Sequence, residues 1–289
     1  MSGFASGIEK KIKGGNKNMK SKAVSILLVT LILMGVTIVS AVDAQDIEKM
    51  MPSKFIEKVV AVDKQKIDDL KKDNKDHINF IKKSLGEDAA KKIIDKYFTD
   101  RAEELKKLPK EVKIQLIELG NNSPQLWPYT SETNGSFIKK DPINLIFYKT
   151  GSAWDVQYDM RYWLTNNWED ASGWTHYTYI GTTNNGLNWR QNDYQLQNGS
   201  YFGTRYHIRI FDGGVDPDWA NQWSDASVHK EHWDWSKMDH VVDSFEQAET
   251  FVKNDFQGKG FVGSIWSANL NNQDIGDNDG QATVIELLY

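Results

Sequence analysis

The sequence predicts an α+β protein in which an N-terminal helical region is followed by a domain with a largely antiparallel sheet and at least one helix. Residues 46–119 alternate lysines with acids and repeat apolar residues at helical spacing. Residues 141–289 hold ten of the eleven tryptophans and several short β-rich runs. We therefore expect four segments: 1–44 as a signal peptide or membrane anchor, 45–119 as a charged helical region, 120–140 as a linker, and 141–289 as an aromatic-rich α+β domain.

The N-terminal segment has the composition of an export signal. An apolar run, Ala23–Val42, follows several lysines and ends in small residues, as the apolar region and cleavage site of a secretory signal do. We expect cleavage after Ala44. With about 20 residues, the run would also cross a bilayer core as a helix, so an uncleaved membrane anchor stays open. Both alternatives place the later residues outside the cytoplasm, either secreted or attached to a membrane.

Charge and composition exclude some classes of function. The formal net charge is -5, and the leader carries six of the 35 basic residues and two of the 40 acidic ones, so its removal would leave -9. A protein this acidic repels phosphate backbones, and we expect no nucleic-acid partner. The chain contains no cysteine, which excludes thiol catalysis and cysteine-ligated metal.

Apolar residues within the charged region recur every three or four positions, which predicts three or four amphipathic helices. We expect these helices to form a solvated hairpin or stalk. The groups that carry the pattern are Phe55, Val59 and Val62, then Ile78, Ile81 and Leu85, then Ile93, Ile94 and Tyr97.

Alternating or β-rich runs separated by Gly, Asn and Asp clusters predict strands in the second domain. Ser244, followed three residues later by Gln247, forms a capping box and predicts a helix that runs to about Phe256. The expected strands are Ile143–Tyr148, Val156–Leu164, His176–Ile180, Tyr201–Phe211, Phe261–Trp266 and Ala282–Leu288.

The densest group of polar side chains lies in residues 229–243, which hold three of the six histidines. Imidazole and carboxylate groups suit zinc, manganese or iron, and His229 and His232 would share a face if this piece were helical. In the alternative, Trp233 and Trp235 pack inward and the histidines form ordinary hydrogen bonds. The metal hypothesis predicts a divalent ion such as zinc, held by His229, His232, Asp234 and His240, with Glu231 or Asp239 as the general base.

A second candidate site lies on the predicted strand around His207. Its alternation places Arg205, His207 and Arg209 on one face. Two arginines beside a histidine could clamp a carboxylate or a phosphate. The same row could instead form internal ion pairs, and the partners considered are Asp234, Asp239 and Asp243.

The order of motifs in the second domain resembles that of the LssY C-terminal domain family. The resemblance covers roughly residues 141–256, and its most specific part is the arginine–histidine strand. The sequence departs from the family pattern by its HKEHWDW insertion. The family has no settled activity to carry over, so the resemblance implies only that Arg205, His207, Arg209, His240 and Asp243 are the positions to test first. The matching motifs are Asp141-Pro-Ile-Asn-Leu145, Arg190-Gln-Asn-Asp193, Arg205-Tyr-His-Ile-Arg-Ile-Phe211 and His240-Val-Val-Asp243.

These observations leave three hypotheses for function. The first is an exported or surface-attached protein without enzymatic activity, whose second domain binds a ligand, for example an envelope component, near Arg205, His207, Arg209 and Asp243. The second is a metal-dependent hydrolase. The third is a carbohydrate-binding module, because exposed Trp and Tyr rings stack on sugars and the domain is rich in both.

Overall fold

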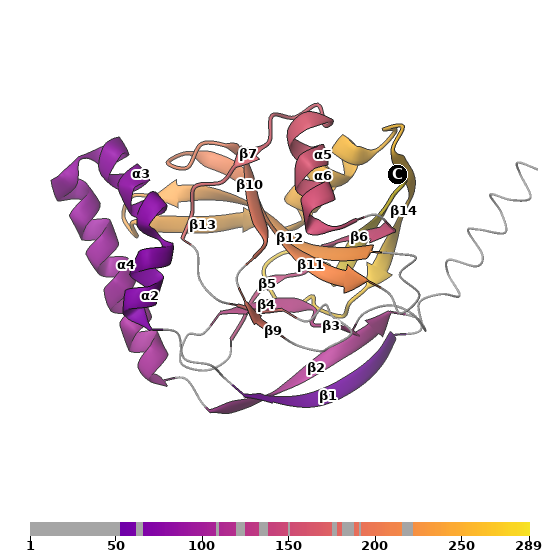
Figure 1. Cartoon of the computed structure of the whole chain (residues 1–289), viewed down its shortest axis with the longest axis horizontal. Coiled ribbons are helices and arrows are strands. Elements are labelled where there is room, and N and C mark those ends of the chain that lie inside the picture. The colour runs from indigo at the N-terminus through magenta and orange to yellow at the C-terminus, as the bar shows by residue number, and fades with distance from the viewer. Residues whose placement is uncertain are drawn as a thin grey trace, which may run out of the picture. The chain divides into compact units, whose positions relative to one another are not determined.

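The structure is a computed structural model that combines helices with an antiparallel-rich sheet, and it confirms the predicted α+β class (Figure 1). Residues 51–289 form one compact unit. The predicted leader, 1–44, lies outside the described residues. No helix within the described part of the chain is both long and apolar enough to cross a membrane. The structure describes residues 53–61, 66–107, 110–119, 125–132, 138–149, 151–174, 178–180, 188–190, 192–215 and 222–289.

The central sheet has eight strands, and it is antiparallel except where β15 pairs with β6. Its long strands β11 and β12 pair from Thr204↔His232 to Val215↔Gln222. In order across the sheet the strands are β14 (Val262–Asn269), β15 (Gln281–Leu287), β6 (Leu145–Lys149), β12 (Gln222–Asp234), β11 (Thr204–Val215), β10 (Tyr194–Gly199) and β7 (Glu169–Asp170), and β13 (Asp239–Ser244) pairs with the far end of β12.

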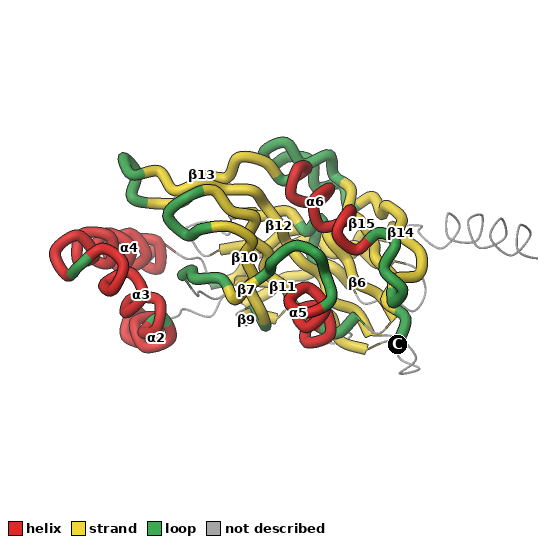
Figure 2. Tube along the Cα trace, turned by 90° about the horizontal axis from the view of Figure 1, so that it is seen from above, coloured by secondary structure: helices red, strands yellow, loops and turns green. Residues whose placement is uncertain are grey.

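Two helices, α5 (Ala153–Tyr162) and α6 (Glu246–Phe256), cover one face of this sheet (Figure 2). Their apolar residues pack against the alternate residues of the strands that face them, which include Ile208 and Ile210. Because strand side chains alternate, the intervening residues of β11 and β12 project from the opposite face.

Two smaller sheets complete the β structure. One contains β1 (Ser53–Ala61), β2 (Glu111–Leu119) and β3 (Gln125–Leu126). Buried residues of β2 and β3 join a second core cluster with residues of the central sheet. The other sheet has the order β5-β4-β8-β9, with β5 (Ile138–Pro142), β4 (Tyr129–Glu132), β8 (Thr178–Ile180) and β9 (Asn188–Arg190).

The helices α2 (Ile67–Asp73), α3 (Lys75–Leu85) and α4 (Glu87–Lys107) confirm the helical interpretation for the middle of the charged region. They are not a solvated stalk, since Ile81, Ala90 and Ile93 pack against Tyr201 and Trp233 of the same compact unit. His77 on α3 also hydrogen-bonds the Tyr201 hydroxyl at 3.1 Å.

Three predictions of secondary structure are wrong. The ends of the charged region are the paired strands β1 and β2, so Phe55 and Val59 lie on a strand. The segment Val156–Leu164, expected as a strand, forms most of α5, whose first turn is capped where the Ser152 hydroxyl accepts the Asp155 N–H. The expected linker contains the strands β3 and β4 and the start of β5.

The other predicted elements are found near their expected positions. Strands β6, β8, β11, β14 and β15 overlap the expected runs. The α6 helix ends at Phe256 as predicted, and the Ser244 hydroxyl accepts the Gln247 N–H at 3.0 Å. This bond satisfies one of the free N–H groups of the first helical turn.

Candidate functional site

The candidate site is built on two neighbouring cross-strand pairs of β11 and β12. Arg205 lies opposite Glu231, and His207 lies opposite His229. All four side chains project from the face that α5 and α6 do not cover, as the alternation of the strands requires. Each is at most 4% exposed, so the sheet holds four ionisable groups out of water at one place.

His207, His229 and Glu231 form a cluster with metal-binding geometry. Their ligand atoms lie within 4.8 Å of one another. The His229 Nε2 atom is 3.0 Å from one Glu231 oxygen, and the His207 Nδ1 atom is 3.6 Å from the other. The two imidazole rings are edge to face, with centroids 5.3 Å apart. Two imidazoles and one carboxylate are ligands that zinc and iron prefer.

Both histidines have ring nitrogens without hydrogen-bond partners among the described residues. These are Nδ1 and Nε2 of His207 and Nδ1 of His229. A buried polar atom without a partner destabilises the folded protein, and a bound ion would remove this cost for the ring nitrogens. Burial and then the Arg205 charge hold the pKa of His207 well below its usual value. The ring is therefore neutral and carries the lone pair that a metal ligand needs.

Arg205 fixes the carboxylate of this cluster. Its Nε donates to Glu231 at 2.7 Å, and its Nη1 donates to the Ser172 carbonyl and the Gln197 side chain. The guanidinium also lies 4.9 Å from the centre of the Tyr201 ring. Burial alone would raise the pKa of Glu231, but His229, which shares a hydrogen bond with this carboxylate, and the Arg205 guanidinium outweigh burial and hold that pKa well below the usual value. Glu231 is therefore an ionised acceptor in a fixed orientation.

A second ion pair continues the row along β11. Arg209 Nη1 donates to Asp141 of β5 at 2.7 Å, and the same Asp141 oxygen lies 4.0 Å from His229 Nδ1. The prediction that Arg205, His207 and Arg209 share a face is therefore confirmed. The acids that pair with the two arginines are Glu231 and Asp141, and not Asp234, Asp239 or Asp243 as considered from the sequence.

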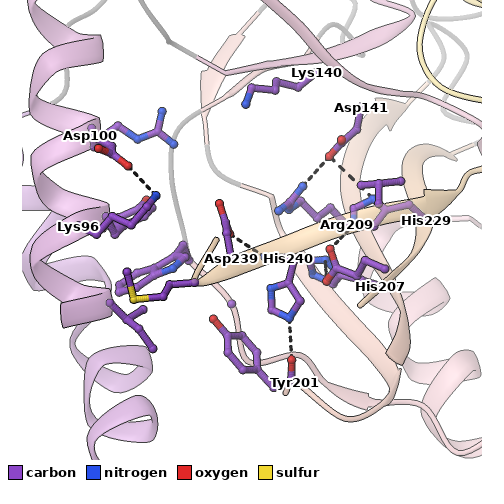
Figure 3. A pocket seen from close by; sticks show the side chains of 18 of the residues that line it. Lys96, Asp100, Lys140, Asp141, Tyr201, His207, Arg209, His229, Asp239 and His240 are labelled. Atoms are coloured by element: carbon purple, nitrogen blue, oxygen red, sulfur yellow. Dashed lines mark hydrogen bonds and ion pairs between the residues drawn. The ribbon is translucent and has the colours of Figure 1, made fainter. Parts of the chain in front are cut away.

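These groups open into a pocket of about 340 Å³ (Figure 3). One wall is the β11 and β12 face, and the facing wall is α4, which contributes Lys96 and Asp100 among others. Lys140 and Asp141 of β5 and Asp239 and His240 of β13 also line the pocket, together with Gly173, Trp174, Tyr201, Met238 and Val242. Most of the described lining groups are polar or charged, so the pocket suits a polar ligand.

The predicted metal ligands do not meet, because the segment with His229 and His232 is a strand and not a helix. Residues three apart on a strand face opposite sides. His232 Nδ1 pairs instead with Asp243 at 2.7 Å, and both side chains are partly exposed. Asp234 accepts the Ser236 N–H and hydroxyl in the turn after β12, and these bonds, with the hydroxyl first, lower its pKa to about 2.

His240 and Asp239 do reach the pocket, in a different role from that predicted. His240 Nε2 donates to the Tyr201 carbonyl at 2.7 Å, so that nitrogen is not available to a metal. Burial is the main cause that lowers the pKa of His240 to about 4; the Glu231 carboxylate opposes it, and the Arg205 charge adds a smaller lowering effect. Asp239 lines the pocket, and its carboxylate accepts the His240 N–H. Of the predicted ligands, only His229 belongs to the His207–His229–Glu231 cluster.

Sequence reasoning missed the contributions of Asp141, Tyr201 and α4. Asp141 stood in a motif of the LssY resemblance, but nothing in its spacing connects it with an arginine 68 residues later. Lys96 and Asp100 form an i,i+4 pair on α4, a pattern that usually marks a solvated helix face. Only the packing of α4 against the sheet turns that face into a pocket wall.

Comparisons with models of known protein families, with curated proteins and with solved structures each gave no match. The resemblance to the LssY C-terminal domain family therefore stays a prediction.

Proposed function

We propose that the protein binds a divalent transition-metal ion through His207, His229 and Glu231, and that the pocket beside this cluster receives a ligand. The observation that supports this most directly is the pair of buried imidazoles with unpartnered nitrogens beside an ionised carboxylate. Three protein ligands of this kind leave a coordination position for water or substrate, as catalytic zinc sites do, whereas structural zinc sites use four.

The charged neighbours of the cluster are compatible with a bound metal. A carboxylate has about four lone-pair directions, so Glu231 can accept from Arg205 and still bind an ion. A hydrogen bond to the carboxylate of a metal ligand holds that ligand in its orientation. Arg205 would act as such a positioning residue, because it fixes one Glu231 oxygen at 2.7 Å.

Hydrolysis is the reaction class that this arrangement supports. A divalent ion with an open position lowers the pKa of bound water and so supplies a nucleophile near neutral pH. Glu231 would be a ligand and not the general base. Asp239 lines the same pocket and is the candidate base. The predicted leader supports a location outside the cytoplasm, where this site would meet an envelope or extracellular ligand.

The metal proposal is tested by elemental analysis of the purified protein after dialysis against zinc and then against metal-free buffer. We expect about one equivalent of zinc in the parent and its loss in His207→Ala, because two ligands hold a divalent ion far more weakly than three. His232→Ala is the matched control and should keep the metal, since His232 pairs with Asp243 outside the cluster. Zinc-free parent protein, or equal loss in both variants, would contradict the proposal.

A row of exposed aromatic rings on α5 favours carbohydrate binding as a second candidate function. Trp154, Tyr158 and Tyr162 are four residues apart and therefore share one helix face. The Trp154 and Tyr158 rings are 5.2 Å apart with planes 20° from parallel, and the Tyr162 ring follows at 4.8 Å. Their exposed fractions are 55%, 37% and 61%. Rings of this type cover the apolar side of a sugar, so a glycan chain could lie along the helix.

We expect that the double variant Trp154→Ala, Tyr162→Ala pulls down with insoluble polysaccharide at least about tenfold more weakly than the parent, because each lost ring removes about 1 kcal/mol of contact. Trp235→Ala is the control, since Trp235 is 59% exposed on the turn after β12. Parent protein that binds none of a panel of cell-wall and storage polysaccharides would remove this candidate.

A further inference from the structure

The charges around the pocket suggest what its ligand is. The described lining residues include as many cations as anions, five of each, so they balance without a metal. A divalent ion at the His207–His229–Glu231 cluster would leave an excess of two positive charges in a partly closed space. Uncompensated charge is costly where water is scarce. The cations are Lys96, Arg101, Lys140, Arg205 and Arg209, and the anions are Asp100, Glu104, Asp141, Glu231 and Asp239.

Arg209 is the lining cation best placed to share a ligand with the metal. It follows His207 by two residues on the same strand face, and its partner Asp141 lies 4.0 Å from His229. The bond to Asp141 uses Nη1, whereas a guanidinium has five N–H donors in a planar fork. Arg209 therefore has further donors for an oxyanion that binds beside the cluster.

We propose that the pocket binds an oxyanion group, a carboxylate or a phosphate, between the metal ion and Arg209. This inference rests on the proposed metal site and names the class of ligand for it. One oxygen of the group would complete the coordination of the metal, and another would accept from Arg209. Lys140 of β5 and Lys96 of α4 line the same pocket, and their positive charges favour an anion there.

The proposal is tested with the full-length protein loaded with Co²⁺, whose visible absorption reports ligand exchange at the metal. Inorganic phosphate and acetate are titrated separately, so that the two sources of oxyanion are distinguished. We expect saturable spectral changes with at least one of them. In Arg209→Gln the dissociation constant for that anion should rise about tenfold or more, because a charge-assisted bond is lost. Arg209→Lys keeps the charge without the planar fork and should give an intermediate value.

Arg161→Gln is the matched control, because Arg161 pairs with Asp170 on the surface outside the pocket. It should leave the anion titration unchanged. Co²⁺ content and the far-ultraviolet circular dichroism spectrum are measured on every variant, so that loss of metal or of fold is seen directly. A parent that takes up no Co²⁺ would refute the metal site itself. A parent that binds Co²⁺ but shows no response to either anion, or an Arg209→Gln variant with unchanged anion affinity, would refute the oxyanion proposal alone.

Discussion

Replacing Arg205 with Met should lower the free energy of unfolding by about 3–5 kcal/mol, because Glu231 would keep a buried charge without its guanidinium partner. Arg205 is 2% exposed and Glu231 is 4% exposed. The substitution also removes donors to the Ser172 carbonyl and the Gln197 side chain. Urea denaturation in the presence of a chelator measures the loss, since bound metal would otherwise add to the apparent stability.

Two further variants separate charge burial from lost packing. Adding Glu231→Gln to Arg205→Met should recover part of the loss, because the carboxylate charge then disappears. Arg161→Met breaks an ion pair whose side chains are 31% and 70% exposed, and should cost less than about 1 kcal/mol. If Arg205→Met cost no more than Arg161→Met, the buried pair would not be the stabilising contact inferred here.

Glu249 should make the protein less stable as the pH rises through the range between about 4.5 and 7. Burial is the main cause that raises the pKa of this α6 side chain to about 7, against the bond that it accepts from Thr283 at 2.6 Å. The folded state therefore holds a proton that the unfolded chain has already lost, so stability is greatest below the unfolded pKa and falls until the folded pKa is passed. A shift of this size corresponds to about 3 kcal/mol.

The measurement is the difference in unfolding free energy between the parent and Glu249→Gln at several pH values. We expect the two proteins to be similar near pH 4, where the parent side chain is protonated, and the variant to be more stable by up to about 3 kcal/mol near pH 8. Taking the difference between the parent and the variant removes the contribution of the other titrating groups to the pH dependence. Glu111→Gln, at an exposed position on β2, is the control variant. If the difference between the parent and Glu249→Gln did not change with pH, folding would not raise the pKa of Glu249.

Short sequence patterns predicted the structure correctly where only one secondary structure fitted them. Ser244 and Gln247 located the start of α6, and the alternation at Arg205, His207 and Arg209 placed those side chains on one face of β11. Both are short-range patterns that the backbone geometry fixes directly.

The failures occurred where composition or periodicity allowed two interpretations. The run Val156–Leu164 alternates well enough to resemble a strand, but Trp154, Tyr158 and Tyr162 also repeat at the helical spacing of four. The lysines and acids of β1 and β2 suggested helices, and the pairing of these strands joins residues as far apart as Ser53 and Leu119. No window of local sequence carries that information.

The site was only partly predictable for the same reason. His229 was predicted as a metal ligand and His207 as a ligand-binding residue, but which side chains would bind the metal together depended on whether residues 229–232 are helical or extended. A helix would bring His229 and His232 together, whereas the observed strand joins His229 with Glu231 and, through the β11 register, with His207.

The segment that contains the helices α2–α4 begins and ends at neighbouring positions. These helices lie between β1 and β2, whose register closes at Ala61 opposite Glu111. The three helices thus form an insertion of about fifty residues between two paired strands. His207 and His229 lie on the central sheet, whereas Lys96 and Asp100 lie on this insertion. Other side chains at positions 96 and 100 would therefore change the charge of the pocket wall and leave the ligand set on β11 and β12 unaltered.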